Sequence, residues 1–295
     1  MKKSKSELIF QIFNIFIMLL LCVIMLYPYL NQLAVSFNES ADTALGGVTL
    51  FPRKFTLANY QTVFKDSAVG SAFLVSISRT ILNVILALVV TFAAAYALTR
   101  KTLYGRGAIA RFLAIPAYVN AGIIPVYILY RYLGLINSYW VYVLPFCFGF
   151  YNMVIFRSFI QELPEELEES ALIDGANEIV IMFKIILPLS LPAVATVALW
   201  VAVGQWNDWT TNLYYITDSK LNTLQYLIMK IIKQGEQLRA DMIMTMTDGE
   251  EAMQQPTSES IKAAMLIITS VPIICTYPFL QKYFVKGVTL GAVKG

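Results

Sequence analysis

The chain has 295 residues, of which 58% are hydrophobic and 14% are charged, with a formal net charge of +3. Soluble domains carry about 25% charged residues, so this composition excludes an ordinary soluble protein and makes the membrane the expected solvent. The small net charge does not single out a partner, and none of the sequence features suggests a nucleic-acid partner.

Six uncharged windows of at least 19 residues divide the chain. Each can cross a hydrocarbon core of roughly 30 Å, which takes about 20 apolar residues in a helix. They predict an all-α integral membrane protein with six transmembrane helices, approximately at 9–31, 76–99, 108–131, 138–159, 185–210 and 261–284. Between them we expect a first outer loop at 38–70, a cytoplasmic loop at 160–184, an outer loop at 214–258 and a cytoplasmic tail at 285–295, all within a single transmembrane domain, 1–295.

The positions of lysine and arginine predict the orientation of the chain. Cytoplasmic segments close to the spans are enriched in these residues. If the N-terminus is cytoplasmic and the spans alternate, the inner segments contain Lys2, Lys3, Arg100, Lys101 and several further basic residues. The other basic residues fall mostly in the two longer outer loops, where charge affects orientation less. Both termini are therefore expected in the cytoplasm.

The second and third predicted spans contain residues that are unusual inside a membrane. Arg79 lies near the start of the second span, where it either reaches the outer interface or faces the interior of the helix bundle. The third span contains Pro116 and Pro125 on either side of Asn120. The backbone groups that the prolines leave without partners fit either a water-lined path or a simple kink, so Asn120 is a candidate for the substrate path.

The residue types needed for metal or redox chemistry are scarce. Cys22, Cys147 and Cys275 each fall inside an apolar window, where a thiol behaves as a small hydrophobic group. The chain has no histidine and no CxxC motif, so no metal site is expected. A membrane enzyme would need a nucleophile, base or metal constellation, and none is visible.

The cytoplasmic loop carries the most specific pattern, which predicts two short helices. Pro164 fits the first turn of a helix, and Glu165 and Glu166 suit the positive N-terminal end of its dipole. Gly175 suits the left-handed residue that ends such a helix. The second helix, from Ile179 to Leu187, is expected to continue straight into the fifth span.

The first of these helices is amphipathic and acidic. Leu163, Leu167 and Ala171 recur every four residues and predict one apolar stripe. The polar side carries four glutamates, and anionic lipids would repel them, so a protein partner is favoured over the lipid surface. An acidic metal site or a hydrolytic carboxylate pair is the alternative, but no histidine or third converging group supports it.

The spacing in this loop resembles the EAA loop of permeases in binding-protein-dependent ABC importers. The positions of the pattern are Glu169, Ser170, Ala171, Gly175, Ile185, Leu187 and Pro188, and all match except Ser170, where the family usually has alanine. In that family the loop forms a coupling helix that docks in a cleft of the ATPase subunit. The resemblance implies this coupling role for the matching residues and for their neighbours Asp174 and Ala176.

Further motifs resemble the carbohydrate-importing branch, and most closely the second-permease type of the maltose system. They are Ala95 to Leu98, Gly134 to Asn137, Trp206 to Trp209 and the tail from Gly287 to Gly295. The run Tyr277 to Phe284 resembles members associated with complex oligosaccharides. The resemblance covers essentially the whole chain and implies the type I importer permease fold, with uptake of a sugar. Two alternatives stay open: an ABC importer of a non-sugar solute, and a secondary transporter coupled to ions.

The resemblance also implies an assembly in a bacterial cytoplasmic membrane. Its expected members are a second, different permease subunit, two ATPase subunits and an extracytoplasmic sugar-binding protein, all acting within membrane lipid. The phosphate-binding pattern GxxxxGK[ST] is absent from this chain. The chain is therefore not expected to be an enzyme or to bind a cofactor, and the partner ATPase would use ATP and Mg²⁺.

The end of the fifth span supplies the other candidates for the substrate path. They are Trp206, Asn207, Asp208 and Trp209. Amide and carboxylate groups can hydrogen-bond sugar hydroxyls, and an indole can stack on a sugar ring. The same residues also fit an interfacial aromatic belt with Asp208 capping a helix end. A secondary transporter would place coupling carboxylates near the middle of the membrane, and spans other than the fifth lack them.

Overall fold

The computed structural model describes residues 5–119, 121–244 and 258–292. Within these residues the secondary structure is helical, and the only extended pairing is an isolated bridge between Asn38 and Phe55. The predicted all-α class is therefore confirmed for the described part of the chain. Two compact units are present, one made of Met1–Val69 and Ile228–Val271, the other of Gly70–Leu227 and Pro272–Gly295.

The first unit contains the long helix α1 (Lys5–Ser36) and the loop that follows it, with the short helices α2 (Ser40–Ala44) and α3 (Ala58–Lys65). The apolar side chains along α1 are exposed from Leu8 to Leu30, as expected for a helix surrounded by lipid or by other subunits. The short helix predicted in the first loop, Leu57 to Phe64, corresponds to α3.

A buried asparagine organises the loop that follows α1. The Asn38 amide donates to a carboxylate oxygen of Asp42 at 2.9 Å, and its Oδ1 accepts the backbone N–H groups of Arg53 and Lys54 at 2.8 and 2.9 Å. Arg53 completes the cluster with an ion pair to Asp42 at 2.9 Å. These contacts join the two irregular segments that also form the bridge between Asn38 and Phe55, and they satisfy backbone groups that would otherwise need water.

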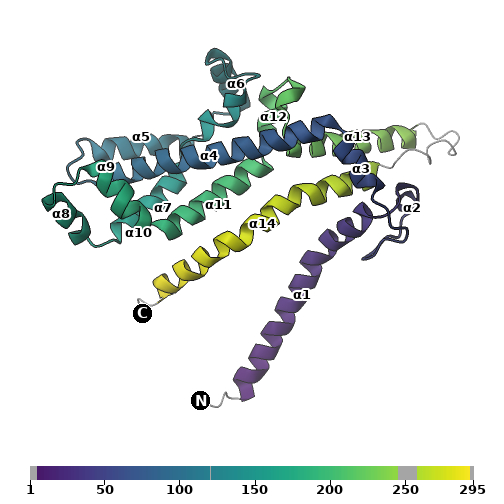
Figure 1. Ribbon diagram of the computed structural model, residues 1–295, viewed down its shortest axis with the longest axis horizontal. Coiled ribbons are helices and arrows are strands. Elements are labelled where there is room, and N and C mark those ends of the chain that lie inside the picture. Colours follow the sequence, from purple (N-terminus) through teal and green to yellow (C-terminus); the bar gives the residue numbers. More distant parts are fainter. Residues whose placement is uncertain (1–4, 120, 245–257, 293–295) are drawn as a thin grey trace. The chain divides into compact units, whose positions relative to one another are not determined.

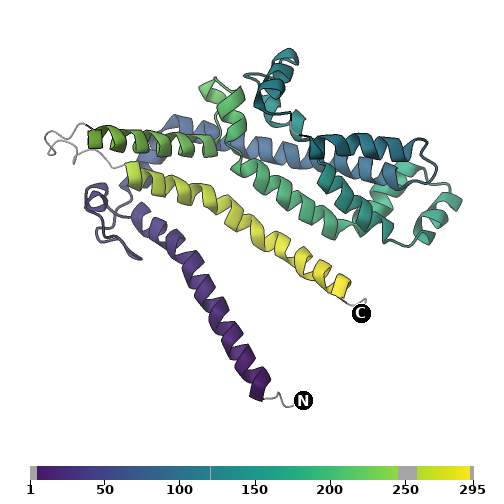
Figure 2. The same ribbon diagram turned by 180° about the vertical axis from the view of Figure 1, so that it is seen from behind.

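The second unit contains most of the remaining helices. They are α4 (Ser67–Thr99), which begins three residues before the unit boundary, α5 (Arg106–Tyr118), α6 (Ile123–Tyr132), η1 (Tyr139–Tyr142), η2 (Leu144–Phe146), α7 (Phe150–Gln161), α8 (Glu166–Ile173), α9 (Glu178–Ile181), the π turn η3 (Met182–Ile186), α10 (Leu187–Leu189), α11 (Leu191–Asn207), α12 (Thr210–Tyr215) and η4 (Ser219–Leu221). Helices α13 (Leu224–Met244) and α14 (Ser258–Ala292) cross the unit boundary. Figures 1 and 2 show α5, α7 and α11 alongside α4, with α8 and α9 at the end where α4 finishes.

Among the residues that the structure describes, three single helices, α1, α4 and α14, are long and apolar enough to cross a membrane. Three bent helix pairs bring the number of candidate spans to as many as six: α5 with α6, η1 and η2 with α7, and the α9–α10 segment with α11. The bend between η2 and α7 is 42°, and the bend between α10 and α11 is 83°. Candidate spans are thus present near all six predicted windows.

The bend before α11 corrects the expectation that the cytoplasmic loop continues straight into the fifth span. The chain turns by 83° at Ser190, between Leu189 and Leu191. Pro188 and Pro192 occupy the first turns of α10 and α11, where their missing N–H groups interrupt no helical hydrogen bond. The two prolines therefore mark two helix starts. The prediction of a straight connection was wrong because the chain bends between them.

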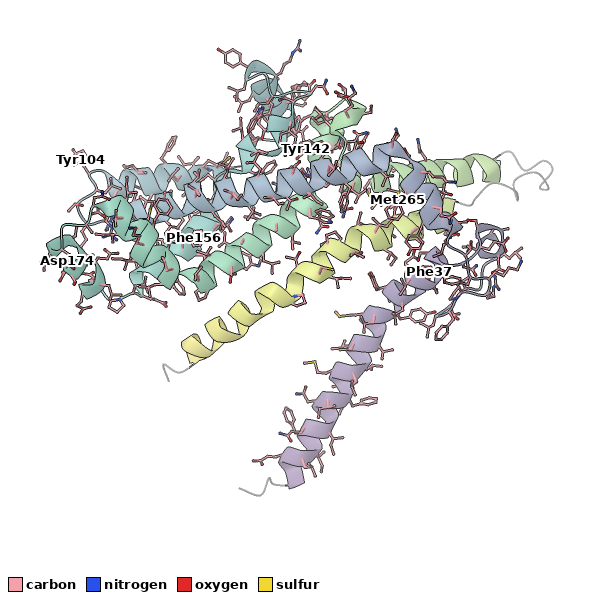
Figure 3. All side chains as sticks on the ribbon, in the orientation of Figure 1. Phe37, Tyr104, Tyr142, Phe156, Asp174 and Met265 are labelled. Carbon is pink, nitrogen blue, oxygen red and sulfur yellow. The ribbon has the colours of Figure 1, made fainter. Side chains whose placement is uncertain are left out.

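The hydrophobic core of the second unit extends along α4. Near the end of α4, Phe92 and Phe156 meet edge to face at 5.2 Å, and Ile186 and Val197 are buried with them. A second buried cluster lies where η1 and α12 meet and includes Val141, Tyr142 and Tyr215. Figure 3 shows Tyr142 beside the middle of α4, Phe156 farther along, and Asp174 beyond the end of the helix. The core therefore connects the middle of α4 with the base of the α8–α9 segment.

Candidate functional site

Helices α8 and α9 form the predicted pair, and Gly175 closes the first of them. Gly175 has a φ of +80°, which is the left-handed conformation expected from the sequence. Its N–H donates to the carbonyl of Leu172 at 3.0 Å, and the N–H of Ala176 donates to the carbonyl of Ala171 at 2.9 Å. This pair of hydrogen bonds is a Schellman motif. The Asn177 side chain then caps α9 by accepting the Val180 N–H at 2.9 Å.

The start of α8 differs slightly from the prediction. Pro164 lies before the helix rather than in its first turn, because Glu165 is the N-terminal cap and α8 begins at Glu166. Three glutamates still occupy the first turn, at 166, 168 and 169. Their negative charges stabilise the positive end of the helix dipole, as expected.

The apolar side of α8 is shorter than the sequence suggested. Ala171 is buried and Leu163 packs against the same core, but the Leu167 side is 41% exposed. The predicted apolar stripe was therefore wrong at Leu167. Because α8 begins after Leu163, Leu163 and Leu167 do not belong to one continuous helix. At the other end of α8, Leu172 and Ile173 are exposed, the latter by 86%.

The acidic side of α8 is divided between two environments. Glu168 forms a two-pronged ion pair with Arg100, which follows the last residue of α4, and Glu165 pairs with Lys101 at 2.9 Å. The Arg100 pair is largely shielded, with side chains 19% and 16% exposed, whereas the Lys101 pair is open to solvent. Glu166 and Glu169 are exposed, and within the described residues neither forms an ion pair.

Arg100 also contacts the second short helix. Its guanidinium carbon lies 4.1 Å from the centre of the Tyr96 ring, and the Tyr96 hydroxyl donates to a carboxylate oxygen of Glu178 at 2.6 Å. Arg100 Nε is 4.0 Å from that same oxygen. The end of α4 is thereby connected to α8 through Glu168 and to α9 through Glu178. We call Tyr96, Arg100, Glu168 and Glu178 the Arg100 cluster.

A groove of about 460 Å³ runs beside this cluster. Its walls come from the end of α4, the turn that follows and α9, and they include Tyr96, Leu103, Tyr104 and Ile179. Tyr104 is almost fully exposed, and Figure 3 shows it at the same end of the molecule as Asp174. The surface around α8 and α9 therefore combines exposed apolar side chains with the carboxylates of Glu166, Glu169 and Asp174, which form no ion pair with the described residues.

The remaining residues of the predicted coupling set divide between surface and core. Ser170, Asp174 and Pro188 are exposed, and Ala176 is half-buried. Ile185 and Leu187 are half-buried against the core that contains Ile186. The set is thus continuous from the exposed tip of α8 to the core contacts of η3 and α10.

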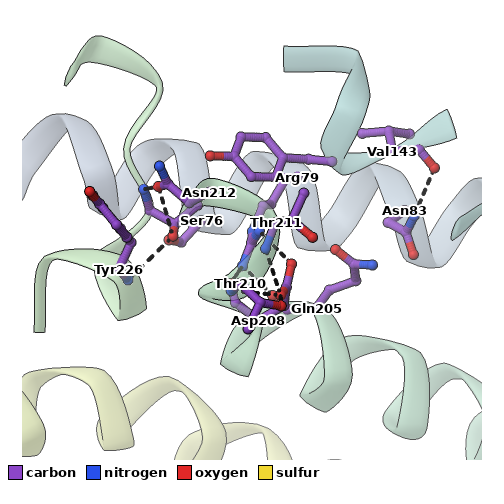
Figure 4. A network of polar contacts seen from close by, with 12 residues as sticks. Ser76, Arg79, Asn83, Val143, Gln205, Asp208, Thr210, Thr211, Asn212 and Tyr226 are labelled. Atoms are coloured by element: carbon purple, nitrogen blue, oxygen red, sulfur yellow. Dashed lines mark hydrogen bonds and ion pairs between the residues drawn. The ribbon is translucent and has the colours of Figure 1, made fainter. Parts of the chain in front are cut away.

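A buried network surrounds Arg79 in the middle of α4. The Arg79 side chain is fully buried, and its NH2 group donates to the backbone carbonyls of Gln205 and Asp208 at 2.5 Å each. It also forms an ion pair with the Asp208 carboxylate at 3.5 Å and lies 4.8 Å from the centre of the Tyr142 ring. Of the two predicted placements for Arg79, the interior of the bundle is confirmed (Figure 4).

Arg79 belongs to a polar stripe of three buried side chains on α4. Ser76 accepts the N–H of Leu224 at 2.9 Å, and the Asn83 amide donates to the carbonyl of Val143 at 3.1 Å. Positions 76, 79 and 83 share one face of a helix. Each contacts backbone at a helix start or end, where hydrogen-bonding groups lack partners within their own helix. The stripe supplies these partners where water is scarce.

Asp208 ends α11 and caps the next helix. Its Oδ1 accepts the N–H and hydroxyl of Thr210 at 3.0 and 2.7 Å and the N–H of Thr211 at 3.2 Å, while Oδ2 faces Arg79. The geometry therefore supports the helix-cap interpretation of Asp208. Both carboxylate oxygens are occupied by contacts within the chain.

The other candidates for the substrate path have different surroundings. Trp206 is buried and meets Phe73 edge to face at 6.3 Å, which supports a packing role. Asn207 is exposed, and its Oδ1 accepts from the Gln225 amide at 3.2 Å. Trp209 is half-buried. Asn120 lies outside the described residues.

Sequence reasoning missed Tyr96, Arg100, Glu178 and Tyr142. Their partners lie far away in sequence: Arg100 and Glu168 are 68 positions apart, and Tyr96 and Glu178 are 82 positions apart. One local signal was available. The pair Arg100-Lys101 and the pair Glu165-Glu168 carry opposite charges on two segments that were both predicted to be cytoplasmic.

Comparison with known proteins places these features in context. Residues 106–290 match the family model described as binding-protein-dependent transport system inner membrane component. Protein LplC of Bacillus subtilis (strain 168) is 36% identical over 296 residues, covering all of this chain and 98% of the relative. The polygalacturonan/rhamnogalacturonan transport system permease protein YtcP of the same organism is 34% identical and covers 94% of this chain and 96% of the relative.

A solved structure supports the fold. One chain of a bacterial ABC transporter involved in the import of the acidic polysaccharide alginate is 26% identical to this chain, with a TM-score of 0.84. The match covers 96% of this chain and 99% of that one. Similarity over nearly the full length of both chains means that the bent spans and the α8–α9 segment are part of a shared architecture.

Proposed function

This chain belongs to the family of binding-protein-dependent transport system inner membrane components, and from this premise we propose that it is a permease subunit of an ATP-driven importer of oligosaccharides. The name of YtcP describes polygalacturonan/rhamnogalacturonan transport, and the similar solved structure belongs to an importer of the acidic polysaccharide alginate, which supports a carbohydrate cargo. The chain is a transport subunit and not an enzyme, and ATP is hydrolysed by a separate ATPase.

We propose that α8 is the element that contacts the ATPase. The observation that carries this proposal is that the four glutamates at the start of α8 have different partners. Glu165 and Glu168 are paired with basic residues of this chain, while Glu169 remains exposed with the apolar tip formed by Leu172 and Ile173 beside it. An exposed carboxylate next to apolar side chains suits a protein interface with a basic group at its rim.

The residues after Glu169 support the same role. Gly175 ends α8 sharply, Ser170 and Asp174 are exposed on it, and Ala171 and Ala176 hold its base against the core. Ile185, Leu187 and Pro188 continue from this base toward α11. We propose that these residues, with Glu169, make up the segment through which ATPase movement reaches the spans.

The proposed arrangement in the membrane has six spans with both termini in the cytoplasm. Three single helices and three bent pairs provide the spans. The orientation places Arg100, Lys101, α8 and α9 on the side where ATP is available, in agreement with the enrichment of basic residues there. In this orientation the first outer loop, ordered around Asn38, faces the extracytoplasmic binding protein.

The proposed assembly contains a second permease subunit, two ATPase subunits and a binding protein in a bacterial cytoplasmic membrane. The family description, which names dependence on a binding protein, supports that partner. ATP and Mg²⁺ would act in the ATPase subunits. For the substrate path we retain three candidates: Asn207, which is exposed at the end of α11, Trp209 and Asn120. Trp206 and Asp208 would lie behind these residues and hold them in place.

The test of the docking role uses the complete importer reconstituted with its binding protein. Glu169→Lys should strongly reduce the amount of ATPase that co-purifies with the permease pair and should abolish uptake, because it reverses the charge of the exposed carboxylate. Glu162→Lys is the matched control, since Glu162 is an exposed glutamate just before α8. Normal ATPase retention and uptake by Glu169→Lys would refute the docking role.

The cargo is tested separately through the binding protein. Titration of that protein with a panel of neutral and acidic oligosaccharides should show tight binding of one class. Binding confined to amino acids, peptides or ions would contradict an oligosaccharide cargo without affecting the docking role of α8.

A further inference from the structure

The Arg100 cluster connects the proposed ATPase-contacting segment to α4. Glu168 comes from α8, Glu178 from the first residue of α9, and Tyr96 and Arg100 from the end of α4. Gly175 lies between the two glutamates in sequence, so the cluster holds the helices on both sides of the left-handed turn. A contact that spans both helices restrains them as one body relative to α4.

The backbone connection of α8 and α9 to α11 is interrupted twice. Between α9 and α11 the chain passes through the π turn Met182–Ile186 and then bends by 83° at Ser190. A π turn and a sharp bend each break the regular hydrogen-bond ladder of a helix. A force on α8 that travelled only along the backbone would therefore have to pass through two interruptions before it reached α11.

The geometry of the Arg100 cluster suits a stiff connection. A guanidinium paired through two nitrogens with one carboxylate has a fixed orientation, which a single-point contact lacks. Stacking on Tyr96 fixes the plane of the same guanidinium, and both Arg100 and Glu168 are shielded from solvent. The neighbouring Lys101–Glu165 pair has neither property, since both side chains are more than 70% exposed.

We infer that Arg100 is a positioning residue that transmits displacement of α8 directly into α4. This inference rests on the proposed contact of α8 with the ATPase. It assigns α4, rather than α11 alone, as the span that receives the movement. Arg79 lies on the same helix about 30 Å away, at 1.5 Å per residue, and holds the α11–α12 junction, so displacement of α4 reaches the network around Asp208.

The experiment compares Arg100→Gln with Lys101→Gln in the complete importer in proteoliposomes. Both variants remove one basic charge from the same end of α4. Three quantities are measured: ATPase retained by the permease pair, ATP hydrolysed in the presence of the loaded binding protein, and sugar transported per ATP. Arg100→Gln should retain the ATPase and continue to hydrolyse ATP, while transporting at least fivefold less sugar per ATP. Lys101→Gln should resemble the native importer in all three.

Further variants test whether Arg100 acts through Glu168. Glu168→Gln should reproduce the loss in sugar per ATP, and the double variant should be no worse than either single variant, because both remove the same connection. Arg100→Lys should restore part of the ratio, since it keeps the charge but loses the two-pronged geometry. An unchanged ratio in Arg100→Gln, or fully additive losses in the double variant, would overturn the inference.

The outcomes distinguish this inference from the docking role of α8. If ATPase retention were insensitive to Glu169→Lys, the docking role itself would fail. If retention depended on Glu169 while the transport ratio did not depend on Arg100, docking would stand and transmission through α4 would fail. If Arg100→Gln lost the ATPase altogether, Arg100 would be needed for docking rather than for transmission, and the inference would likewise be overturned.

Discussion

Arg79 in α4 and Asp208 at the end of α11 form an ion pair at 3.5 Å, although 129 residues separate them in sequence. The guanidinium is fully buried, and it also binds the carbonyl of Asp208 itself. One residue of the α11–α12 junction is thus held through both its side chain and its backbone.

The first prediction concerns removal of the buried cation. Arg79→Leu would leave the Asp208 carboxylate and two carbonyls without their donor. Loss of one partner of a buried pair costs on the order of 3 kcal/mol, so we expect a clear drop in the thermal unfolding midpoint of the purified importer. Arg79→Lys keeps the charge and should lose less. Equal unfolding midpoints for the native and leucine forms would show that the pair does not stabilise the fold.

The second prediction separates the two roles of Asp208. Asp208→Asn keeps an oxygen that can cap α12 but loses the charge facing Arg79, whereas Asp208→Ala loses both. A lost helix cap costs about 1 kcal/mol, so the alanine form should be less stable than the asparagine form by roughly that amount. We expect Asp208→Ala to reduce uptake and to leave ATPase retention unchanged. If the alanine variant were less stable but took up substrate at the native rate, Asp208 would cap the helix and have no role in uptake.

The third prediction concerns the turn between α8 and α9. Gly175→Ala meets no atom within 4 Å of the added Cβ, so the cost comes from the backbone, where a left-handed φ disfavours a side chain by roughly 1–2 kcal/mol. Hydrogen exchange of residues 166–181 should accelerate in Gly175→Ala. Gly175→Asn should be milder, because asparagine tolerates this conformation.

A harsher substitution at the same turn provides the comparison. Gly175→Pro also removes the N–H that binds the Leu172 carbonyl, and it should abolish uptake and weaken ATPase retention while membrane insertion stays normal. Uptake at the native level by Gly175→Pro would mean that the geometry of this turn is not needed for coupling.

The fourth prediction concerns acid sensitivity of the loop that follows α1. The hydrogen bond from Asn38, aided by Arg53, lowers the pKa of Asp42 below its usual value near 3.8. Because the folded-state pKa is lowered, this contribution to stability is complete above about pH 4 and is lost as the pH falls through the folded-state pKa. Proteolysis of residues 38–56 by an acid protease should therefore increase on acidification below pH 4. In Asp42→Asn the loop should be weaker at neutral pH and should lack this acid-dependent step.

Local features of the α8–α9 segment could be predicted from the sequence. The acidic first turn, Gly175 and the two short helices each follow from residue preferences that act over a few positions. The exposed Leu167 and the 83° bend at Ser190 could not be predicted in this way. Both depend on where a helix starts relative to its neighbours, and periodicity alone does not define that position.

The pairing of residues far apart in the chain could not be predicted from the sequence either. Arg79 could be recognised as costly inside a membrane, but its partner could not be identified, because Asp208 also fitted an interface or a helix end. Arg100 was counted only as a basic residue near a span. Its pairing with Glu168 follows from the packing of α4 against the α8–α9 segment, which no single stretch of sequence contains.

The two groups of polar contacts on α4 also limit how this helix can move. Ser76, Arg79 and Asn83 lie on one face, whereas Tyr96 and Arg100 lie on another, roughly a third of a turn away at about 3.6 residues per turn. A helix held on two faces at separate heights cannot rotate about its own axis without breaking one group of contacts. Its remaining freedom is tilting and sliding, so the α11–α12 junction and the α8–α9 segment would be displaced together.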